Sequence, residues 1–240
     1  MSDAARIARQ VFASKPKGLT YTHFRPSAVD LASIDATLSV ATAESAYSAA
    51  ISYAEAMSNL QHGSTAWSIV KLYYSCFYSL RTLLLLNQVV PFNSGSEMLL
   101  DIDGKKFQKG GKSSHHWNWK SINKVGAVGR SWFTSSDSEE AYGKLRKHRE
   151  NVNYTHSFPD PDFHKCLVSK ENDLGKRFRT YRDDSAFFYT YLDDHLAIAY
   201  PTKLIFQLDT SLKAASIFLD EEKIAHLKSV WKMKDRCPIS

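Results

Sequence analysis

The segment at residues 64–86, STAWSIVKLYYSCFYSLRTLLLL, carries large apolar side chains on most faces of a helix and has one polar seam. The seam recurs at steps of three or four residues and consists of Ser64, Ser68, Lys71, Ser75, Ser79 and Thr82. Residues at this spacing lie on one side of an α-helix. The pattern therefore predicts a helix from about Ser64 to Asn87, buried nearly all round and stopped by Pro91. The seam is expected to face solvent, to pack closely against another helix, or to line a polar pocket.

Further helices are predicted along most of the chain. Residues 41–60 are rich in alanine and contain no helix breaker. Other helices are expected at the N-terminus and at residues 137–156, 162–180, 184–200 and 221–234. We expect an irregular stretch up to about Asp35, a β-like patch at residues 98–103 that ends in an Asp103-Gly104 turn, and an interruption at Pro201. The prediction is an all-α fold in one domain, residues 1–240, with additional C-terminal helices.

Composition narrows the class of protein. The 240 residues are 43% hydrophobic and 23% charged, which is typical of globular domains and excludes general disorder. The three cysteines lie far apart and form no C-x-x-C pair, so neither a disulfide framework nor a cysteine zinc site is expected. The formal charge of +6, with a pI of about 9.1, favours a polyanionic partner.

The sequence also bears on location. The most apolar stretch, Trp67–Val90, is interrupted by Lys71 and Arg81, so we expect no membrane-spanning segment. The N-terminus has the pattern of a short amphipathic helix and lacks the apolar centre of a secretory signal. These features predict a cytoplasmic protein.

Residues 91–136 form a basic insertion between the expected core helices. From residue 104 to 136 there is no Asp or Glu, while lysines and aromatic residues alternate along a stretch rich in glycine and serine. The predicted RNA-contacting residues are Lys105, Lys106, Lys109, Lys112, Trp117 and Trp119. The lysines would neutralise phosphates, and these tryptophans and Phe107 would stack on unpaired bases. Alternatively, the insertion is a solvated loop whose tryptophans pack back onto the helices.

The helix predicted at residues 137–156 places two ionisable side chains on its apolar side. On a wheel of 100° per residue, Arg149 and His156 fall in the same stripe as Tyr142, Leu145 and Val152. A buried guanidinium must meet a partner or face a wet pocket. One interpretation is a structural ion pair and a core histidine. The other is an anion site, in which Arg149 grips a phosphate and His156 moves protons.

A polar pocket is predicted around this pair. Its supporting residues are Lys71 and Ser75 from the seam and Glu150 and Asn153 from the helix that carries the pair. The seam would thus form the second wall of the site.

Two segments together resemble the HEPN superfamily of small helical-bundle proteins. Residues 64–86 look like the aromatic-rich second helix of that family, with its Tyr-Tyr pair and an Arg-Thr-Leu-Leu stretch. Residues 149–156, RENVNYTH, look like the R-x4-6-H motif, with Arg149 and His156 at its ends and Glu150 where Asn, Asp or His is more usual. The two matching segments cover about an eighth of the chain, and their order along the sequence also fits.

The resemblance implies an up-and-down helical bundle with a metal-independent endoribonuclease site and no cofactor. His156 would act as general base or acid on the ribose hydroxyl or leaving oxygen, and Arg149 would stabilise the charged phosphorane. Such proteins commonly form homodimers in which both protomers surround one scissile phosphate. The family also populates toxin–antitoxin and antiphage-defence systems, which implies an antitoxin or defence-system protein as a possible partner.

Several other functions remain as alternatives. The main one is a non-catalytic HEPN-like module that binds nucleic acid or a protein. A Ser or Cys hydrolase is disfavoured because no G-x-S-x-G occurs and Cys76 lies in the buried aromatic helix. His115-His116 lacks further ligands at metal spacing. The acidic pairs Asp183-Asp184 and Asp193-Asp194 suit helix caps and solvated faces better than a Mg²⁺ site. No phosphate-binding glycine loop is present.

Overall fold

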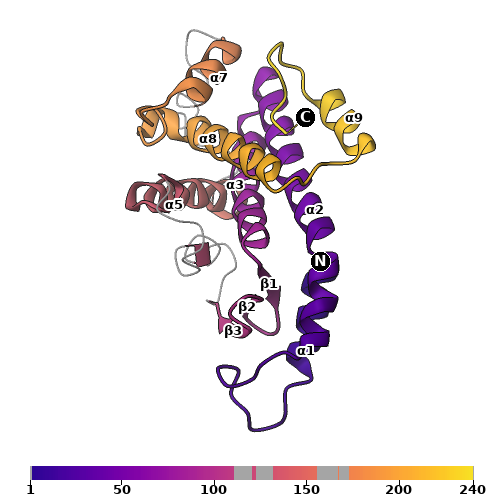
Figure 1. Ribbon diagram of the computed structural model, residues 1–240. Coiled ribbons are helices and arrows are strands. Elements are labelled where there is room, and N and C mark those ends of the chain that lie inside the picture. The colour runs from indigo at the N-terminus through magenta and orange to yellow at the C-terminus, as the bar shows by residue number, and fades with distance from the viewer. Residues whose placement is uncertain (1, 111–120, 123–131, 156–166, 168–172, 240) are drawn as a thin grey trace.

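The computed structural model describes residues 2–110, 121–122, 132–155, 167 and 173–239. Within these ranges the protein is mainly α-helical and contains one small antiparallel sheet (Figure 1). The mainly helical character is as predicted. The sheet confirms the predicted β-like patch, since one strand spans Glu97–Asp101, and it adds two strands that the all-α prediction did not include.

Helix α2 (Ala28–Gln61) is the long helix along which the other elements are arranged. It starts at a capping box in which the Ser27 hydroxyl accepts from the Asp30 amide and the Asp30 carboxylate accepts from the Ser27 amide. The expectation of an irregular stretch up to Asp35 was therefore wrong, because this cap begins the helix eight residues earlier. At 34 residues, α2 is about 50 Å long.

Helix α3 (Thr65–Leu86) returns along α2 and confirms the helix predicted from residues 64–86. Fifteen of its residues are buried, including Ser68, Ser75, Ser79 and Thr82 of the polar seam. The helix ends at Asn87, followed by Gln88 with φ of 60°, before the chain reaches Pro91. The small seam residues therefore serve close packing inside the protein, which is one of the three predicted roles.

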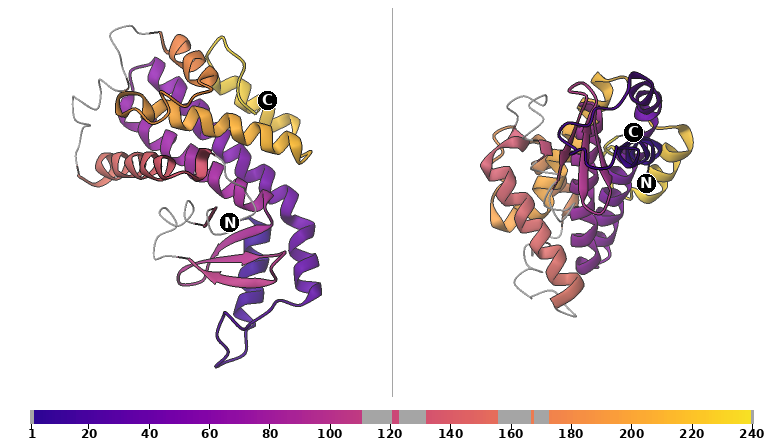
Figure 2. Two further views of the ribbon diagram at one scale, coloured as in Figure 1. Left: turned by 60° about the vertical axis from the view of Figure 1, so that its left-hand side comes forward. Right: turned by 90° about the horizontal axis from the view of Figure 1, so that it is seen from below.

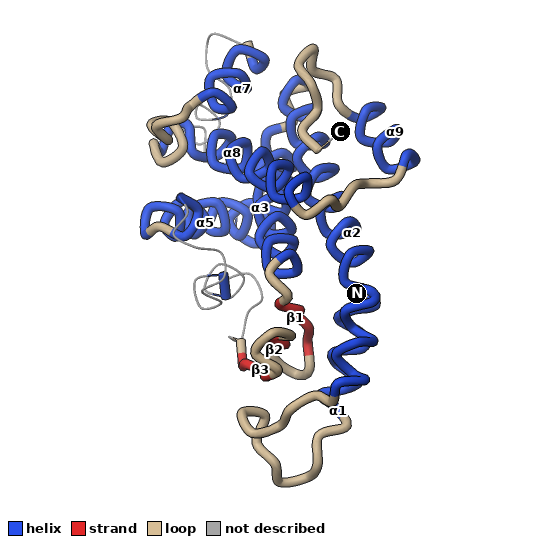
Figure 3. The backbone as a smooth tube through the Cα atoms, in the orientation of Figure 1, coloured by secondary structure: helices blue, strands red, loops and turns tan. Residues whose placement is uncertain are grey.

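One end of α2 supports a separate apolar cluster. Helix α1 (Asp3–Ala13) packs on α2 and on strand β1 (Val89–Asn93), and β1 pairs with β2 (Glu97–Asp101). Strand β3 (Lys106–Lys109) completes the antiparallel order β1-β2-β3, with Leu100 opposite Phe107. The predicted Asp103-Gly104 turn joins β2 to β3. Figures 2 and 3 show this sheet beside α1, at the end of the molecule opposite α7, α8 and α9.

The larger core lies around α3 and the other end of α2. It includes α5 (Ser136–Glu150), α7 (Leu174–Asp183), α8 (Asp193–Ala214) and α9 (Glu221–Val230). A short 3₁₀ turn, η1 (Trp132–Thr134), precedes α5, and a π-helical turn, η2 (Asn151–Thr155), follows it. Both α5 and α8 pack against α3. The contact between α3 and α5 is the one that positions Arg149.

Two predicted boundaries in this half were wrong. Residues 184–192 are not helical, and α8 runs from Asp193 through Pro201 without ending there. Pro201 and its neighbours are buried, and the hydroxyl of Thr202 donates to the carbonyl of Ile198 one turn earlier. Burial of this face, together with the side-chain hydrogen bond, compensates for the helix bond that proline cannot make.

In the described part of the chain, α3 is long and apolar enough to cross a membrane by length and composition alone. Of its most apolar window, 72% is buried inside the protein. Contrary to the expectation from Lys71 and Arg81, these two charges do not exclude α3 as a membrane-spanning segment by composition. Its burial among the other helices, however, is typical of a core helix.

Candidate functional site

Arg149 lies in the last turn of α5 and points into the protein, as the helical wheel predicted. Its residue is 7% exposed, and Tyr142 and Leu145 of the same stripe are also buried. The Nη2 group donates to the hydroxyl of Tyr74 at 3.1 Å. The Cζ atom lies 5.6 Å from the ring centroids of both Tyr73 and Tyr74. Consecutive tyrosines of α3 therefore hold the guanidinium by cation–π contact and a hydrogen bond.

Tyr73 and Tyr142 remain protonated at neutral pH. The Tyr73 and Tyr142 hydroxyls are 3.1 Å apart. Burial raises the pKa of Tyr73, which the nearby positive charge of Arg149 lowers by less. Burial also raises the pKa of Tyr142. The positively charged guanidinium of Arg149 therefore lies against the rings of Tyr73 and Tyr74 and donates a hydrogen bond to the Tyr74 hydroxyl.

The second residue of the motif, His156, lies outside the described residues. The segment before it departs from the prediction, since the α-helix ends at Glu150 and Asn151–Thr155 form the π-helical turn η2. A π-helix turns less per residue than an α-helix, so a uniform wheel does not describe the segment after Glu150, although Val152 still packs against the larger core as predicted. Such turns occur frequently at functional sites.

The four supporting residues lie in different surroundings. Lys71 forms an ion pair with Glu55 of α2, and Ser75 is buried in the core. Glu150 lies 3.8 Å from Arg146, and Asn153 is exposed. None of the four forms a hydrogen bond or an ion pair with Arg149. Arg149 instead contacts Tyr73 and Tyr74, which lie in the segment at residues 64–86. The adjacent positions of these two tyrosines were the available sequence signal for this contact.

The basic insertion is described in part. Lys105, Lys106 and Lys109 are exposed at the β2–β3 turn and along β3, and Lys106 lies 3.5 Å from Asp101. Lys112, Trp117 and Trp119 lie outside the described residues. Phe107 is 2% exposed and stacks on Phe24 with ring centroids 5.5 Å apart. It is a core residue, so the prediction that it would stack on bases was wrong.

Alternative catalytic groups find structural roles. The described residues contain no group of three or more His, Cys, Asp or Glu placed to hold a metal ion. Asp183 pairs with Arg182, and Asp184 accepts from the amides of the following turn. Asp193 pairs with Lys144 at 2.6 Å. Burial raises the pKa of the Cys76 thiol, which makes it a poor nucleophile.

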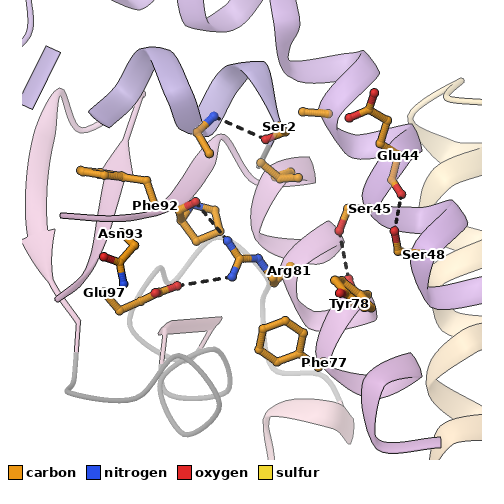
Figure 4. A pocket seen from close by; sticks show the side chains of 14 residues that line it. Ser2, Glu44, Ser45, Ser48, Phe77, Tyr78, Arg81, Phe92, Asn93 and Glu97 are labelled. Atoms are coloured by element: carbon orange, nitrogen blue, oxygen red, sulfur yellow. Dashed lines mark hydrogen bonds and ion pairs between the residues drawn. The ribbon is translucent and has the colours of Figure 1, made fainter. Parts of the chain in front are cut away.

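A pocket of about 510 Å³, not predicted from the sequence, opens between α1, α2, α3 and the first two strands (Figure 4). At its floor, Arg81 of α3 donates to Glu97 of β2 at 3.4 Å and to the carbonyl of Pro91 at 3.2 Å. Glu97 is 5% exposed, although its residue type is rarely buried. The sequence signal that could have indicated this pocket was Arg81, a charged residue within the apolar segment at residues 64–86.

The Arg81–Glu97 pair is strongly desolvated. Burial lowers the pKa of Arg81, and the charge of Glu97 opposes that shift. Burial also raises the pKa of Glu97, against the smaller effect of Arg81. At 3.4 Å the contact is longer than a normal charge-assisted hydrogen bond. The two charged groups therefore retain hydrogen-bonding capacity toward the pocket.

A polar chain on α7 and α8 was also missed. Arg177 Nε donates to the Tyr181 hydroxyl at 3.0 Å, and that hydroxyl lies 2.8 Å from His195 Nδ1. Because Tyr181 accepts from Arg177, its own proton is directed to Nδ1. A neutral His195 with its proton on Nε2 satisfies this arrangement, because its Nδ1 then accepts from Tyr181. Its pKa is lowered by burial first and by Arg177 second.

Comparison of the chain with family models, with curated proteins and with solved structures finds no match. The site therefore has to be interpreted from its own geometry.

Proposed function

We propose that the protein acts on RNA as a HEPN-like, metal-independent endoribonuclease. Arg149 binds the scissile phosphate and stabilises the phosphorane, and His156 transfers protons at the ribose hydroxyl or the leaving oxygen. The observation that carries the proposal is the fixed guanidinium of Arg149 on Tyr73 and Tyr74. A guanidinium oriented before substrate arrives needs little rearrangement to stabilise developing negative charge.

The surrounding chain supports an RNA substrate in two ways. The protein carries a formal net charge of +6, and three lysines of the predicted RNA-contacting set are exposed at the β2–β3 turn and on β3. The π-helical turn directly after Arg149 places an irregular backbone where the motif continues toward His156. We propose that the protein works as a cytoplasmic homodimer, as a toxin or antiphage-defence effector whose activity is controlled by an antitoxin or another defence-system protein.

A second candidate is a non-catalytic HEPN-like module that binds RNA or a protein partner. One observation favours it. Arg149 is only 7% exposed and packs as a core residue does, with its guanidinium on aromatic rings. In this case Arg149 stabilises the contact between α3 and α5, and RNA binding does not depend on it.

The decisive experiment compares Arg149→Lys and His156→Ala with the wild-type protein on total RNA, with and without EDTA. Lysine keeps the charge of Arg149 but loses the planar fork. We expect EDTA-resistant cleavage with 2′,3′-cyclic phosphate ends, and a loss of about 100-fold or more in each variant. Arg149→Ala is a poorer test, because removing the buried stacked side chain should itself destabilise the protein by about 1–3 kcal/mol.

Arg146→Lys is the matched control for Arg149→Lys. Arg146 lies on the same helix, but its side chain is 32% exposed and faces Glu150. Cleavage should survive this change. RNA binding without cleavage in the wild type would support the non-catalytic candidate. Inhibition by EDTA with rescue by Mg²⁺ would contradict both roles assigned to the Arg149 site.

A further inference from the structure

The Arg81 pocket combines charges of both signs with aromatic walls. Arg81 and the buried Glu97 face each other across its floor, and Glu44 of α2 lines its exposed side. Phe77, Tyr78 and Phe92 supply ring surfaces. One guanidinium and two carboxylates make the lining negative overall, which disfavours a ligand recognised only through its phosphate. A suitable ligand offers hydrogen-bond donors to Glu97 and an acceptor to Arg81, side by side.

Glu97 is the residue that restricts the ligand most. It is 95% buried, and its Oε1 accepts from Arg81 over a long distance of 3.4 Å. Within the described part of the chain, Arg81 is the one hydrogen-bond partner of the Glu97 carboxylate. A buried carboxylate has four lone-pair positions and is costly to leave undersatisfied. The floor of the pocket can therefore accept two further donors from a ligand.

Arg81 provides the complementary group. Its side chain is 25% exposed, and two of its five N–H groups are used, on Glu97 and on the carbonyl of Pro91. Its Cζ lies 5.5 Å from the ring centroid of Phe77, which fixes the guanidinium plane. Figure 4 shows Arg81 extending from α3 toward Glu97, beside Phe77. The remaining N–H groups are available to a carbonyl oxygen placed next to donors bound by Glu97.

We propose that this pocket binds a guanine base, with its N1–H and N2–H groups on Glu97 and its O6 on Arg81. Guanine presents two donors and one carbonyl acceptor along a single edge, which matches the carboxylate–guanidinium pair. Its flat ring suits the aromatic walls, because bases stack well on such surfaces. A volume of about 510 Å³ accommodates a nucleoside and lies within the usual range for small-ligand sites.

The base is supplied either by a free guanine nucleotide or by an unpaired guanosine in RNA. The second source rests on the proposed function and has local support. Strand β3 pairs with the strand that carries Glu97, because the amide of Gly110 donates to the carbonyl of Glu97 at 2.7 Å and Lys109 pairs with Met98. The exposed lysines of β3 and its preceding turn thus lie on the sheet that carries Glu97, where the phosphates of a strand could be neutralised.

The test is calorimetric titration of the full-length protein with guanosine, inosine and adenosine. We expect guanosine to bind, inosine to bind about tenfold more weakly because it lacks the N2 amine, and adenosine to bind at least 100-fold more weakly. GMP and a single-stranded oligonucleotide with one guanine distinguish the two sources. A preference for the oligonucleotide that declines with salt identifies RNA, and a preference for GMP identifies a nucleotide ligand.

Two variants locate the site. Glu97→Gln replaces one acceptor oxygen by a donor and should weaken guanosine binding at least tenfold. Its matched control, Glu222→Gln, changes an exposed glutamate at the start of α9 and should have no effect. Ser48→Phe fills the pocket from α2 without removing a charge, so it tests the site even if Glu97→Gln is unstable.

Absence of guanosine binding at millimolar concentration, or equal binding of all nucleosides, would overturn the proposal. Preferential binding of arginine or another amino acid would also do so, since a zwitterion suits the same charges. Guanosine binding is measured without RNA cleavage, and Arg149→Lys should retain it. Failure of this proposal is therefore distinguishable from failure of the proposed ribonuclease activity.

Discussion

Arg149 and Arg81 show two ways in which the fold accommodates a largely buried positive charge. Arg149 lies on the rings of Tyr73 and Tyr74, while Arg81 meets the carboxylate of Glu97 and a backbone carbonyl. In the first arrangement, aromatic rings contact the positive charge, and neither α3 nor α5 places a buried carboxylate beside it. The second introduces a buried acid that is itself costly. This difference explains why we assign phosphate binding to Arg149 and base recognition to the Arg81 pocket.

The neutral state of His195 predicts a pH dependence of stability. Burial and Arg177 hold the folded-state pKa of His195 below the unfolded value of about 6.5, so the unfolded chain binds more protons. The stabilising contribution is complete above that pH and is lost as the pH falls through the folded-state pKa. We expect the melting temperature to decline between pH 7.5 and 5.5, and to decline less in His195→Asn, which keeps an acceptor for Tyr181.

His62→Asn is the control for this comparison, because His62 is exposed. Part of the decline should remain in His195→Asn, since burial also lowers the pKa of His148. Identical pH profiles for the wild-type protein and His195→Asn would show that His195 is not held neutral by the fold.

At the scale of elements, the start of α2 depends on one local motif. Ser27→Ala removes the hydroxyl that accepts from the Asp30 amide at 3.2 Å. We expect the free energy of unfolding, measured by urea denaturation, to fall by about 1 kcal/mol. Ser33→Ala is the control, since this exposed hydroxyl bonds to a carbonyl within the helix and caps nothing. Equal effects of the two changes would contradict a specific role for the cap.

Strand β3 and its flanking residues carry a prediction on RNA binding. If about four lysines touch the phosphates of a single strand, the log–log slope of affinity against salt should be about −3. Changing Lys105, Lys106, Lys109 and Lys112 to Ala should flatten this slope and weaken binding, with little change in melting temperature. The measurement is fluorescence anisotropy with single-stranded RNA across a salt series.

A second quadruple variant controls for net charge in that experiment. It replaces four exposed lysines near the C-terminal half of the chain: Lys176, Lys228, Lys232 and Lys234. The net charge of the protein falls by the same amount as in the first quadruple variant, but Lys105, Lys106, Lys109 and Lys112 are unchanged. If the salt slope is the same in both variants, β3 is not the RNA-contacting element.

At the scale of the whole molecule, we predict a homodimer with the Arg149 helices near its two-fold axis. Trp67 is 62% exposed and lies two turns before Tyr74 on the same side of α3. An exposed tryptophan beside the site suits burial against a second copy. Light scattering at micromolar concentration should give a dimer, and Trp67→Glu should shift it to monomer and reduce RNA cleavage.

Phe218→Ser provides the control for assembly. Phe218 is 70% exposed in the loop between α8 and α9, away from α3. This variant should remain dimeric and active. A wild-type protein that is strictly monomeric and still cleaves RNA would contradict the requirement for a second protomer.

Features with local causes could be predicted from the pattern of amino acids alone. The apolar pattern of residues 64–86 predicted α3, and the spacing of Tyr142, Leu145 and Arg149 predicted the inward face of α5. Both follow from the 3.6-residue period of the helix, which acts over a few turns. The capping box at Ser27 and Asp30 was equally local, but the weak helical propensity of the residues after it concealed the start of α2.

Features that require residues far apart in the chain follow from the packing of helices and strands against one another. Pro201 continues within α8 because burial outweighs its local tendency to end a helix. The π-helical turn η2 changes the helical period after Glu150, so a uniform helical wheel could not place the residues that follow. Arg81 and Glu97 meet because α3 and β2 are brought together around an apolar cluster that includes α1. Their pairing depends on packing between elements, and packing has no period that a single sequence displays.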